Sequence, residues 1–273
     1  SEVPEWQPDM CIQCNQCAYV CPHAAIRPFL IDEEEMKKAP AKMETLKPVG
    51  KGMDGLRYKI QVSPLDCTGC GSCVHICPAP KGKAIVMKSI ESQIERNDVE
   101  NAEYLHENVT YKDHIMDKGT VKGPQFAKPL FEFSGACAGC GETPYIKLIT
   151  QLFGERMMIA NATGCSTIYG GTAPSTPYTT GACGSGPAWA SSLFEDNAEY
   201  GYGMFQAEDT IRHRMAKIMD EISGEISLEL ATIFSEWKEN MNDGTKTTEI
   251  KAKMIPLLEI EAKNNEKIQE ILN

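Results

Sequence analysis

Two copies of one cysteine pattern lie in the first 78 residues, and they constrain the fold more than any other feature of the sequence. Both copies read C-x2-C-x2-C-x3-C-P; the first is Cys11, Cys14, Cys17, Cys21 and Pro22, and the second is Cys67, Cys70, Cys73, Cys77 and Pro78. A cubane iron–sulfur cluster needs four thiolates at tetrahedral corners. A tight loop supplies three of them, and the fourth must come from further away. The pattern therefore predicts a compact domain built around two [4Fe–4S] clusters.

In two-cluster ferredoxins, the fourth cysteine of each run ligates the other cluster. The predicted ligand sets are therefore crossed: Cys11, Cys14, Cys17 and Cys77 for one cluster, and Cys67, Cys70, Cys73 and Cys21 for the other. Gly69 and Gly71 lack Cβ atoms, so we expect backbone N–H groups to approach the sulfurs there. Two such clusters make an electron relay, and something else must supply the electrons. His23 and His75 lie beside the motifs, where packing or surface roles are more typical than ligation.

Zinc sites and disulfides are the alternatives for these eight cysteines. A structural zinc site uses four ligands, commonly as two C-x2-C pairs, and would leave spare thiols in each run. Disulfides between such near neighbours would be strained and would need an oxidising compartment. The polar start of the sequence has neither the basic nor the apolar region of a signal peptide, so we expect a cytoplasmic protein.

Charge and hydropathy argue against two classes of partner. The formal net charge of −11 argues against nucleic acid, because phosphate binding needs a basic surface. The sequence holds no run of about 18 apolar residues, so we expect no membrane-spanning helix. The first residue is Ser1 rather than Met, and we expect a chain that is processed, trimmed or cut from something longer.

We expect two domains, at residues 1–125 and 126–273. The first is an α+β ferredoxin-like domain with an insertion at 27–61. An acidic run and a glycine-rich stretch within this insertion are typical of solvated loops. Residues 91–125 are polar and charged, and we expect them to connect the domains.

The second domain begins with an α/β pattern. Thr143 and Pro144 predict the N-cap and the first residue of a helix that ends at Gly154. Residues 157–160 predict a short buried strand that runs into a loop at 161–165. Helix, strand and loop in this order favour an α/β domain.

The last third of the sequence is predicted to be helical. Apolar spacing over residues 206–240 predicts a long amphipathic helix that is broken near Gly224. A turn at 242–244 ends this helix, and a charged helical segment that contains Pro256 follows.

A second group of cysteines lies in glycine-rich loops. Cys137 and Cys140 form a C-x2-C motif, and Cys165 follows about one helix and one strand later. A lone C-x2-C fits a redox dithiol or half of a zinc site, whereas the glycines around Cys140 favour a loop wrapped closely around a bound group. The three cysteines would supply three ligands of a third cluster, without an obvious fourth. Cys183 is the remaining cysteine and is more typical of an unligated thiol.

Four stretches make a family resemblance specific. They are FSGACAGCGETPY at 133–145, NATGCSTIYGG at 161–171, PSTPYT at 174–179 and SLFEDNAE at 192–199. In this order they resemble pyruvate:ferredoxin oxidoreductases, and the likeness extends from the ferredoxin-like segment to at least Met204. The PSTPYT stretch is similar to the single-chain members of that family more than to the multi-subunit ones.

The resemblance implies a thiamine-dependent enzyme that cleaves pyruvate and delivers the acetyl group to coenzyme A. Two electrons would pass through three [4Fe–4S] clusters to ferredoxin or flavodoxin. Cys137, Cys140 and Cys165 match the family's ligands of the cluster nearest thiamine diphosphate. Glu142 and Cys165 match positions that contact this cofactor. Thiamine stabilises a carbanion, so a cluster beside it is a natural first electron acceptor.

The chain also departs from the family. No Gly-Asp-Gly occurs, so the family's Mg²⁺ site lies largely outside this chain. The family's fourth ligand of the thiamine-proximal cluster lies beyond Asn273, and the pyruvate-binding domain lies far upstream. The run at 181–186 differs from the family's usual polar loop, which leaves no role for Cys183.

We therefore expect an interior portion of a longer enzyme: a ferredoxin-like two-[4Fe–4S] domain followed by part of an α/β thiamine-diphosphate-binding domain. No catalytic residue is assigned, and the chain alone should not decarboxylate pyruvate. The expected partners are the remainder of the same enzyme and the acceptor ferredoxin or flavodoxin, in a homo-oligomer. The alternatives are another 2-oxoacid:ferredoxin oxidoreductase and a stand-alone two-cluster electron carrier.

Overall fold

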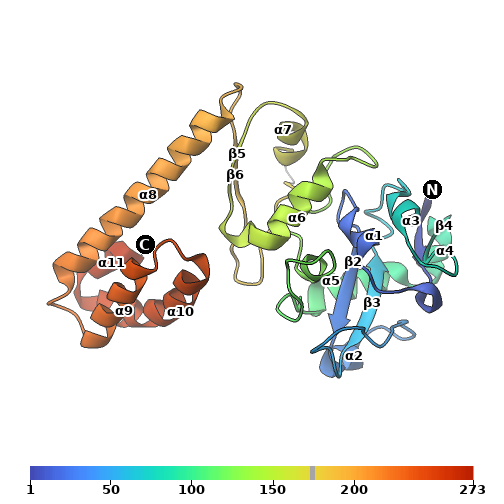
Figure 1. Ribbon diagram of the computed structural model, residues 1–273, viewed down its shortest axis with the longest axis horizontal. Helices are drawn as coiled ribbons and strands as arrows, with labels where there is room; N and C mark the ends of the chain where they lie inside the picture. Colours follow the sequence, from blue (N-terminus) through green and yellow to red (C-terminus); the bar gives the residue numbers. More distant parts are fainter. Residues whose placement is uncertain (173–175, 273) are drawn as a thin grey trace. The chain divides into compact units, whose positions relative to one another are not determined.

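The computed structural model describes residues 1–172 and 176–272, which form two compact units (Figure 1). The first unit is Ser1–Asn197 and the second is Ala198–Asn273. The domain boundary expected between residues 125 and 126 lies inside the first unit and stays a prediction. Within the described residues, no helix combines the length and apolar content that a membrane crossing needs.

Two antiparallel strand pairs frame the cysteine runs. They are β1 (Glu2–Trp6) with β4 (Ile85–Ser89), and β2 (Ile26–Ile31) with β3 (Arg57–Val62). The short helical elements among them are η1 (Pro8–Met10), α1 (Gln16–Tyr19) and α3 (Ser72–Ile76). Because α1 and α3 occupy equivalent places in the two cysteine runs, the sequence repeat is also a structural repeat (Figure 1).

Strand β2 is buried on both faces and separates two apolar clusters. Ile26 and Leu30 point into a cluster that includes Tyr58 and the cysteines Cys17 and Cys73. The alternate residues of β2 point into the second cluster, which contains Phe29, Ile31, Met43, Leu105 and Val109. Side chains alternate along a strand, so a strand between two cores is mostly apolar; the exception in β2 is Arg27, which is buried with an ion-pair partner.

The expected connector at 91–125 is instead part of the first unit. Helices α4 (Ile90–Glu95) and α5 (Asp98–Asn108) lie within it, followed by η2 (Gly123–Phe126). Leu105 of α5 is fully buried in the second cluster. The segment is polar on average because only a narrow stripe of α5 faces the core, and this composition made it resemble a linker.

The acidic run of the insertion was also expected to be a loop, and it begins helix α2 (Glu33–Lys38). A capping box starts this helix: the Asp32 carboxylate accepts from the Glu35 N–H at 2.9 Å, and the Glu35 carboxylate accepts from the Asp32 N–H at 2.9 Å. Acidic residues are favourable in the first turn of a helix because of its dipole. The glycine-rich stretch at 50–55 forms turns and bends, as expected.

The rest of the first unit has an α/β order, as predicted. Its elements are α6 (Thr143–Phe153), η3 (Gly154–Arg156), β5 (Met158–Asn161), α7 (Cys165–Gly170) and β6 (Ala188–Ser191), and β5 pairs with β6 in parallel. Glu142 rather than Thr143 is the N-cap of α6, so Thr143 is the first helical residue. The strand begins one residue later than predicted, and the prediction that it is buried is wrong: Met158 is exposed and the other residues are half-buried, because β5 has only β6 beside it among the described strands.

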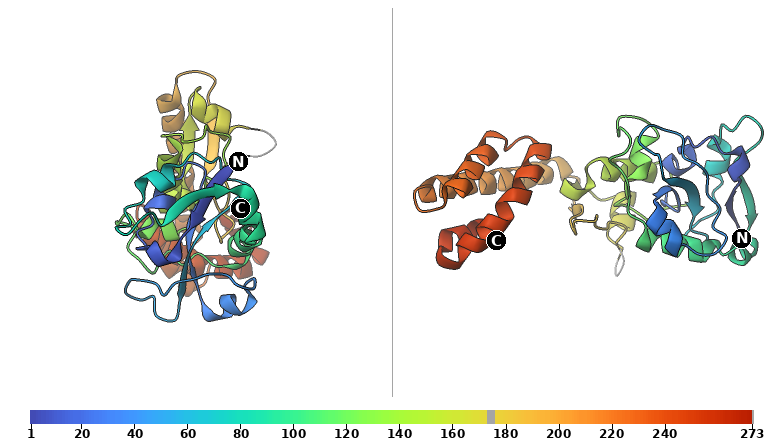
Figure 2. Two further views of the ribbon diagram at one scale, coloured as in Figure 1. Left: turned by 90° about the vertical axis from the view of Figure 1, so that its right-hand side faces the viewer. Right: turned by 90° about the horizontal axis from the view of Figure 1, so that it is seen from below.

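The second unit is helical. Its elements are α8 (Asn197–Ile222, which starts at the last residue of the first unit), α9 (Leu228–Glu239), α10 (Gly244–Glu261), η4 (Ala262–Asn264) and α11 (Glu266–Leu272). Two further views show these helices, coloured orange to red, packed around one another (Figure 2). The predicted break near Gly224 separates α8 from α9, and Pro256 lies inside α10 as predicted. The helix before residues 242–244 ends there as expected, since α9 stops at Glu239, and Asp243 of this turn also caps α10.

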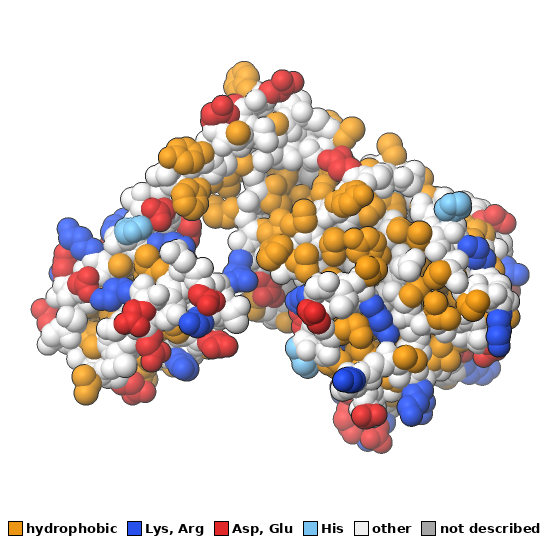
Figure 3. Space-filling model, viewed as in Figure 1, with side chains coloured by type: hydrophobic (Ala, Val, Ile, Leu, Met, Phe, Trp, Pro, Cys, Tyr) orange, Lys and Arg blue, Asp and Glu red, His pale blue; other side chains and the backbone are white. Residues whose placement is uncertain are grey.

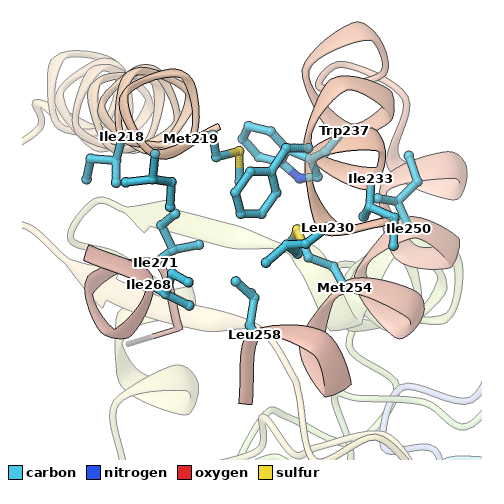
Figure 4. Packing of buried hydrophobic residues seen from close by; sticks show 12 residues of the cluster. Ile218, Met219, Leu230, Ile233, Trp237, Ile250, Met254, Leu258, Ile268 and Ile271 are labelled. Atoms are coloured by element: carbon cyan, nitrogen blue, oxygen red, sulfur yellow. The ribbon is translucent and has the colours of Figure 1, made fainter. Parts of the chain in front are cut away.

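Apolar side chains from all four of these α-helices meet in one core (Figure 4). Leu230, Phe234 and Trp237 come from α9, and Met254 and Leu258 come from α10. The core is built from residues of the second unit alone, so its stability is a property of that unit.

Glu35→Gln should destabilise the first unit at pH 7. Burial opposes ionisation of Glu35, but hydrogen bonds from Lys112, Asp32 and Thr110 outweigh it and lower the pKa from 4.5 to about 2. This stabilisation is present above pH 4.5 and is lost as the pH falls toward 2. We expect a loss of about 1 kcal/mol after solvent screening. Urea unfolding at several pH values should show the wild-type advantage shrinking below pH 4.5; a difference that stays constant down to pH 2 would contradict this account.

Leu230→Ala should destabilise the second unit by roughly 2–5 kcal/mol, because it opens a cavity in the core. Leu230 is 0 % exposed. Leu228, two residues earlier in α9, is 85 % exposed and supplies the matched control Leu228→Ala. Thermal unfolding followed by circular dichroism at the helical minimum should separate the two variants. Equal unfolding midpoints would show that the core in Figure 4 does not stabilise the unit.

Candidate iron–sulfur centres

The two cysteine runs have the same backbone conformation. Gln13 and Gly69 occupy equivalent positions with φ of 58° and 68°, and Asn15 and Gly71 do so with φ of 61° and 76°. The N–H groups of Gln13 and Gly69 each point at the sulfur of the first cysteine of their own run, at 3.4 Å. Hydrogen bonds to the sulfurs are one of the ways in which a protein sets the potential of a cluster.

The first run reaches this conformation without glycine. Buried side-chain hydrogen bonds hold it: Asn15 accepts from the Tyr58 hydroxyl at 2.7 Å and donates to the Lys122 carbonyl at 3.1 Å. Gln13 donates to the Lys47 carbonyl at 2.8 Å. In the second run Gly69 has a steric role as well, because a Cβ there would lie 2.7 Å from the Glu2 carbonyl oxygen. The expected role of glycine therefore applies to the second run only, and sequence reasoning missed Gln13 and Asn15.

One of the two predicted ligand sets lines a single cavity. The cysteines along it are Cys21, Cys67, Cys70 and Cys73, with Gly71 and Ser72 between the last two. The empty space, counted out to solvent at its mouth, is about 370 Å³. The cavity takes its fourth thiol from the first run and so matches the crossed assignment. Four convergent thiols around one cavity fit a cubane cluster.

The neighbours of each thiol follow the same division. Burial raises the pKa of Cys73 to about 12, and Cys21, Cys67 and Cys70 act in the same direction. In the other set, burial raises the pKa of Cys11, and Cys14 and Cys77 add to the increase. Neighbouring thiols raise a pKa because two thiolates repel each other. Each set is thus internally close, which is the arrangement that the crossed ligand assignment requires.

Cys17 and Cys73 connect the two sets. Burial raises the pKa of Cys17 well above 9.0, and Cys73 is the neighbour that adds most to this increase. Both residues also lie in the same apolar cluster. Within residues 1–172 and 176–272, no three histidine, cysteine or carboxylate side chains lie close enough together to hold a single metal ion. The thiols are therefore more widely spaced than the ligands of a mononuclear zinc site.

The loop of Cys137 and Cys140 lies against the set of Cys21, Cys67, Cys70 and Cys73. The Cys140 N–H donates to the Cys137 carbonyl at 3.0 Å, which closes a tight turn. Gly139 within this turn has a φ of +73°, and a Cβ built on it would lie 3.6 Å from the Cys70 Cβ. The C-x2-C loop and the thiol cavity are thus direct neighbours.

Cys140 lies directly before helix α6. Burial raises its pKa, but hydrogen bonds from Thr143 and Glu142 outweigh this and make the net shift downward. A lowered pKa favours the thiolate, which is the form that ligates iron. Cys165 is the first residue of α7 and is exposed. Tyr169, one turn further along α7, lies near Cys140 and Glu142.

Glu142 lies beside two tyrosines. Burial and the Glu142 carboxylate raise the pKa of Tyr178 to about 12 and raise that of Tyr169 further. The Tyr169 hydroxyl is buried near Glu142 without a hydrogen bond of normal geometry. The Thr143 hydroxyl is likewise buried without an oxygen or nitrogen partner. The Tyr169 hydroxyl lies within reach of the Glu142 carboxylate, and the Thr143 hydroxyl lies within reach of the Cys140 sulfur.

An aromatic cluster holds this region together. Phe131 contacts Tyr169 and Tyr178 with ring centroids 5.7 and 5.0 Å apart, and Tyr178 stacks on Trp189 at 6.4 Å. A Cβ at Gly170 would lie 3.0 Å from the Trp189 ring, so glycine is needed there. Residues 174 and 175 of the PSTPYT stretch lie outside the described residues.

The remaining candidates lie apart from the thiol sets. Cys183 is exposed, next to Gly184, whose N–H donates to the Gly181 carbonyl at 3.1 Å. His23 is buried and packs as expected, with its Nδ1 atom 3.1 Å from the Ser134 carbonyl oxygen. His75 is exposed.

Helix α6 meets the dicluster region through its polar face. Lys147, Thr150 and Gln151 are buried, whereas Tyr145 and Phe153 are exposed. The Lys147 ammonium donates hydrogen bonds to three carbonyls of the first cysteine run: that of Ala18, and those of Tyr19 and Cys21, each at 3.2 Å. Burial lowers the pKa of Lys147 to about 8, so the group carries a charge at neutral pH.

A second contact that sequence reasoning missed holds the segment before Cys137. Arg27 is buried and forms an ion pair with Glu132. Its guanidinium also lies 5.1 Å from the centroid of the Phe133 ring. The Phe133 N–H donates to the His23 carbonyl at 2.9 Å. An arginine within strand β2 could have pointed to this contact, but its partner lies more than 100 residues away.

Cys77→Ser should remove roughly half of the bound iron, because Cys77 is the predicted fourth ligand of the set that contains Cys11, Cys14 and Cys17. Cys183→Ser is the matched control and should leave the iron of both sets unchanged, since Cys183 belongs to neither predicted set. Iron and acid-labile sulfide per chain, measured after anaerobic purification, give the readout. Full iron content and an unaltered EPR spectrum in Cys77→Ser would contradict the crossed assignment.

The sequence matches known proteins over most of its length. A family of 4Fe-4S dicluster domains matches residues 10–80. The pyruvate-flavodoxin oxidoreductase of Enterobacter agglomerans is 53 % identical over 252 residues, which are 90 % of this chain and 21 % of the relative. The pyruvate:ferredoxin oxidoreductase of Moorella thermoacetica is 57 % identical over 226 residues, 82 % of this chain and 18 % of the relative.

A third relative, the mitochondrial pyruvate dehydrogenase [NADP(+)] of Euglena gracilis, is 46 % identical over 93 % of this chain and 14 % of its own length. The chain thus spans about one-fifth or less of the length of these relatives. It contains a 4Fe-4S dicluster domain and is homologous, over most of its length, to the pyruvate:ferredoxin and pyruvate-flavodoxin oxidoreductases.

Proposed function

We propose that this chain is the electron-transfer portion of a thiamine-dependent oxidoreductase that converts pyruvate and coenzyme A to acetyl-CoA and CO₂. The observation that carries the proposal is the contact between the Cys137–Cys140 loop and the thiol cavity. An electron released near this loop would therefore have the dicluster domain as its nearest acceptor. The homology to pyruvate oxidoreductases supplies the reaction class.

The contacts support one order for the proposed relay. The first site is the group bound by Cys137, Cys140 and Cys165, and the Gly139–Cys70 contact leads to the set of Cys21, Cys67, Cys70 and Cys73. The Cys17–Cys73 contact then leads to the set of Cys11, Cys14, Cys17 and Cys77. Ferredoxin or flavodoxin would accept the electrons from this last set.

Glu142 and Cys165 would contact thiamine diphosphate, which supplies carbanion stabilisation when it is bound. The Glu142 carboxylate with the Tyr169 and Tyr178 hydroxyls near it gathers polar groups beside Cys140, which supports a ligand at this place. The Mg²⁺ that accompanies the diphosphate would be held largely by residues outside this chain. This chain's own contribution is to bind one side of the cofactor and to place the Cys140 thiolate near it.

The remainder of the same enzyme is the proposed partner of the apolar face of α6. Tyr145, Ile149 and Phe153 follow one another at four-residue spacing and are 66 %, 45 % and 57 % exposed. Figure 3 shows hydrophobic side chains gathered where α6 lies in the first unit. An apolar helical stripe of this kind normally faces a core or an interface. A homo-oligomer in the cytoplasm is part of the same proposal.

The test of the relay is a count of iron and acid-labile sulfide on the anaerobically purified chain, with EPR of the reduced form. About eight irons would support two cubanes. About twelve would mean that the third site also closes, through Cys183 or a partner's thiolate. Cys137→Ser separates these outcomes. It should lower a count of about twelve irons and leave a count of about eight unchanged. Zinc in place of iron, or no metal, would overturn the proposal.

The test of the reaction uses the longer enzyme that contains this chain. Pyruvate with coenzyme A should reduce the two clusters of the dicluster domain, so that their EPR signals appear. In Cys137→Ser pyruvate should no longer produce these signals, while dithionite should still reduce both clusters. Reduction by 2-oxoglutarate or indolepyruvate in place of pyruvate would instead assign another 2-oxoacid oxidoreductase. A chain that is stable and soluble alone and exchanges electrons like a ferredoxin, with no longer enzyme containing it, would favour a free electron carrier.

A further inference from the structure

Each cysteine run ends in the same contact with a lysine. Lys147 donates hydrogen bonds to the carbonyls of Tyr19 and Cys21 at 3.2 Å each. Lys83 donates to the carbonyls of His75 and Cys77 at 3.1 and 2.8 Å. His75 and Cys77 occupy the positions of the second run that Tyr19 and Cys21 occupy in the first. The repeat therefore extends to the cation that covers the end of each run.

The two lysines differ in burial. Lys147 is 2 % exposed, whereas Lys83 is exposed to solvent. A charge acts more strongly on its neighbours in the protein interior than at the surface, where water and salt screen it. Equivalent contacts thus have unequal electrostatic effects on the two thiol sets.

The Lys147 charge is also uncompensated. The other buried cation nearby, Arg27, forms an ion pair with Glu132. Lys147 takes part in no ion pair among the described residues. Its hydrogen-bond acceptors are backbone carbonyls. A buried, unpaired ammonium loses hydration that its carbonyl acceptors replace only in part. A negatively charged group beside it would offset this cost, and a cluster ligated by four thiolates is such a group.

We propose that Lys147 is a positioning residue whose buried ammonium raises the reduction potential of the cluster held by Cys21, Cys67, Cys70 and Cys73. Reduction adds one electron and one negative charge to that cluster, so a fixed positive charge nearby favours the reduced form. Lys147 donates to the Cys21 carbonyl, and Cys21 is the thiol that most opposes the lowering of the Lys147 pKa, ahead of Cys17 of the other set. The inference rests on the proposed two-cluster relay.

The position of this cluster gives the effect a consequence. Its thiol set touches the Cys137–Cys140 loop and is the first set that an electron from the loop reaches. A higher potential there draws the electron out of the thiamine-proximal site. Lys122 is half-buried beside Cys11 and Cys14, so its charge acts on the other set.

The test is a redox titration with dithionite as the electron source, followed by EPR on the anaerobically purified chain. Lys147→Met should change the reduction equilibrium of one cluster at least tenfold toward the oxidised form, a downward shift of 59 mV or more for one electron. The other cluster should shift less. Lys83→Met is the matched control and should shift either cluster by less than this amount. Lys147→Arg keeps the charge and should restore most of the potential.

The shifted signal is assigned by combining Lys147→Met with Cys77→Ser, which disrupts the other set and leaves the signal of interest. Equal shifts of both clusters, or equal shifts from Lys83→Met and Lys147→Met, would overturn the proposal. So would a lowered melting temperature without a change in potential, which is the signature of a purely structural contact.

Lys147→Gln keeps two hydrogen-bond donors without the charge, and it replaces Lys147→Met if that variant does not bind iron. If neither neutral variant binds iron while Lys147→Arg does, the ammonium acts in assembly, and its proposed role in setting the potential is rejected. Absence of iron from the unmodified chain would instead refute the underlying relay, so the two failures are distinguishable.

Discussion

A tight cysteine loop can direct only three thiols at one centre, and this limit determines how the first unit is built. In the predicted sets the fourth thiol comes from the other run, so neither set would be complete until both loops have met. The strand pairs β1–β4 and β2–β3 bring the loops together, and Cys17 and Cys73 share one apolar cluster between them. The two cysteine runs are therefore packed together although they are far apart in the sequence, as four-thiolate ligation of each cluster would require.

The sequence predicted the dicluster domain because its ligands recur at fixed spacing, and the match over residues 10–80 confirms it. The ligand sets themselves stay predictions. The helix over 98–108 escaped prediction because burial there depends on strand β2 having two covered faces, which local patterns do not reveal. The conformation at Gln13 and Asn15 was also missed, since it is stabilised by distant partners such as Tyr58 rather than by glycine.

Helix α6 shows a further limit of pattern reasoning. Its existence and length were predicted to within a residue, but an apolar stripe is normally assigned to the core. Here the polar face is buried, because the first cysteine run ends in carbonyls that need donors and Lys147 supplies them. The residue types on each face of α6 thus depend on what that face contacts. The contact of the polar face lies within the first unit, and the proposed contact of the apolar face lies outside it.

The outward apolar face of α6 also has a consequence inside a cell. Exposed hydrophobic surface is what chaperones and proteases recognise when they triage incompletely folded chains. The dicluster frame can reach its final packing while this stripe, with Tyr145 and Phe153, remains uncovered. If the proposed remainder of the enzyme covers this stripe, a copy that does not meet it would expose an apolar surface to chaperones and proteases despite a well-packed interior. Exposure of α6 would then distinguish assembled from unassembled copies.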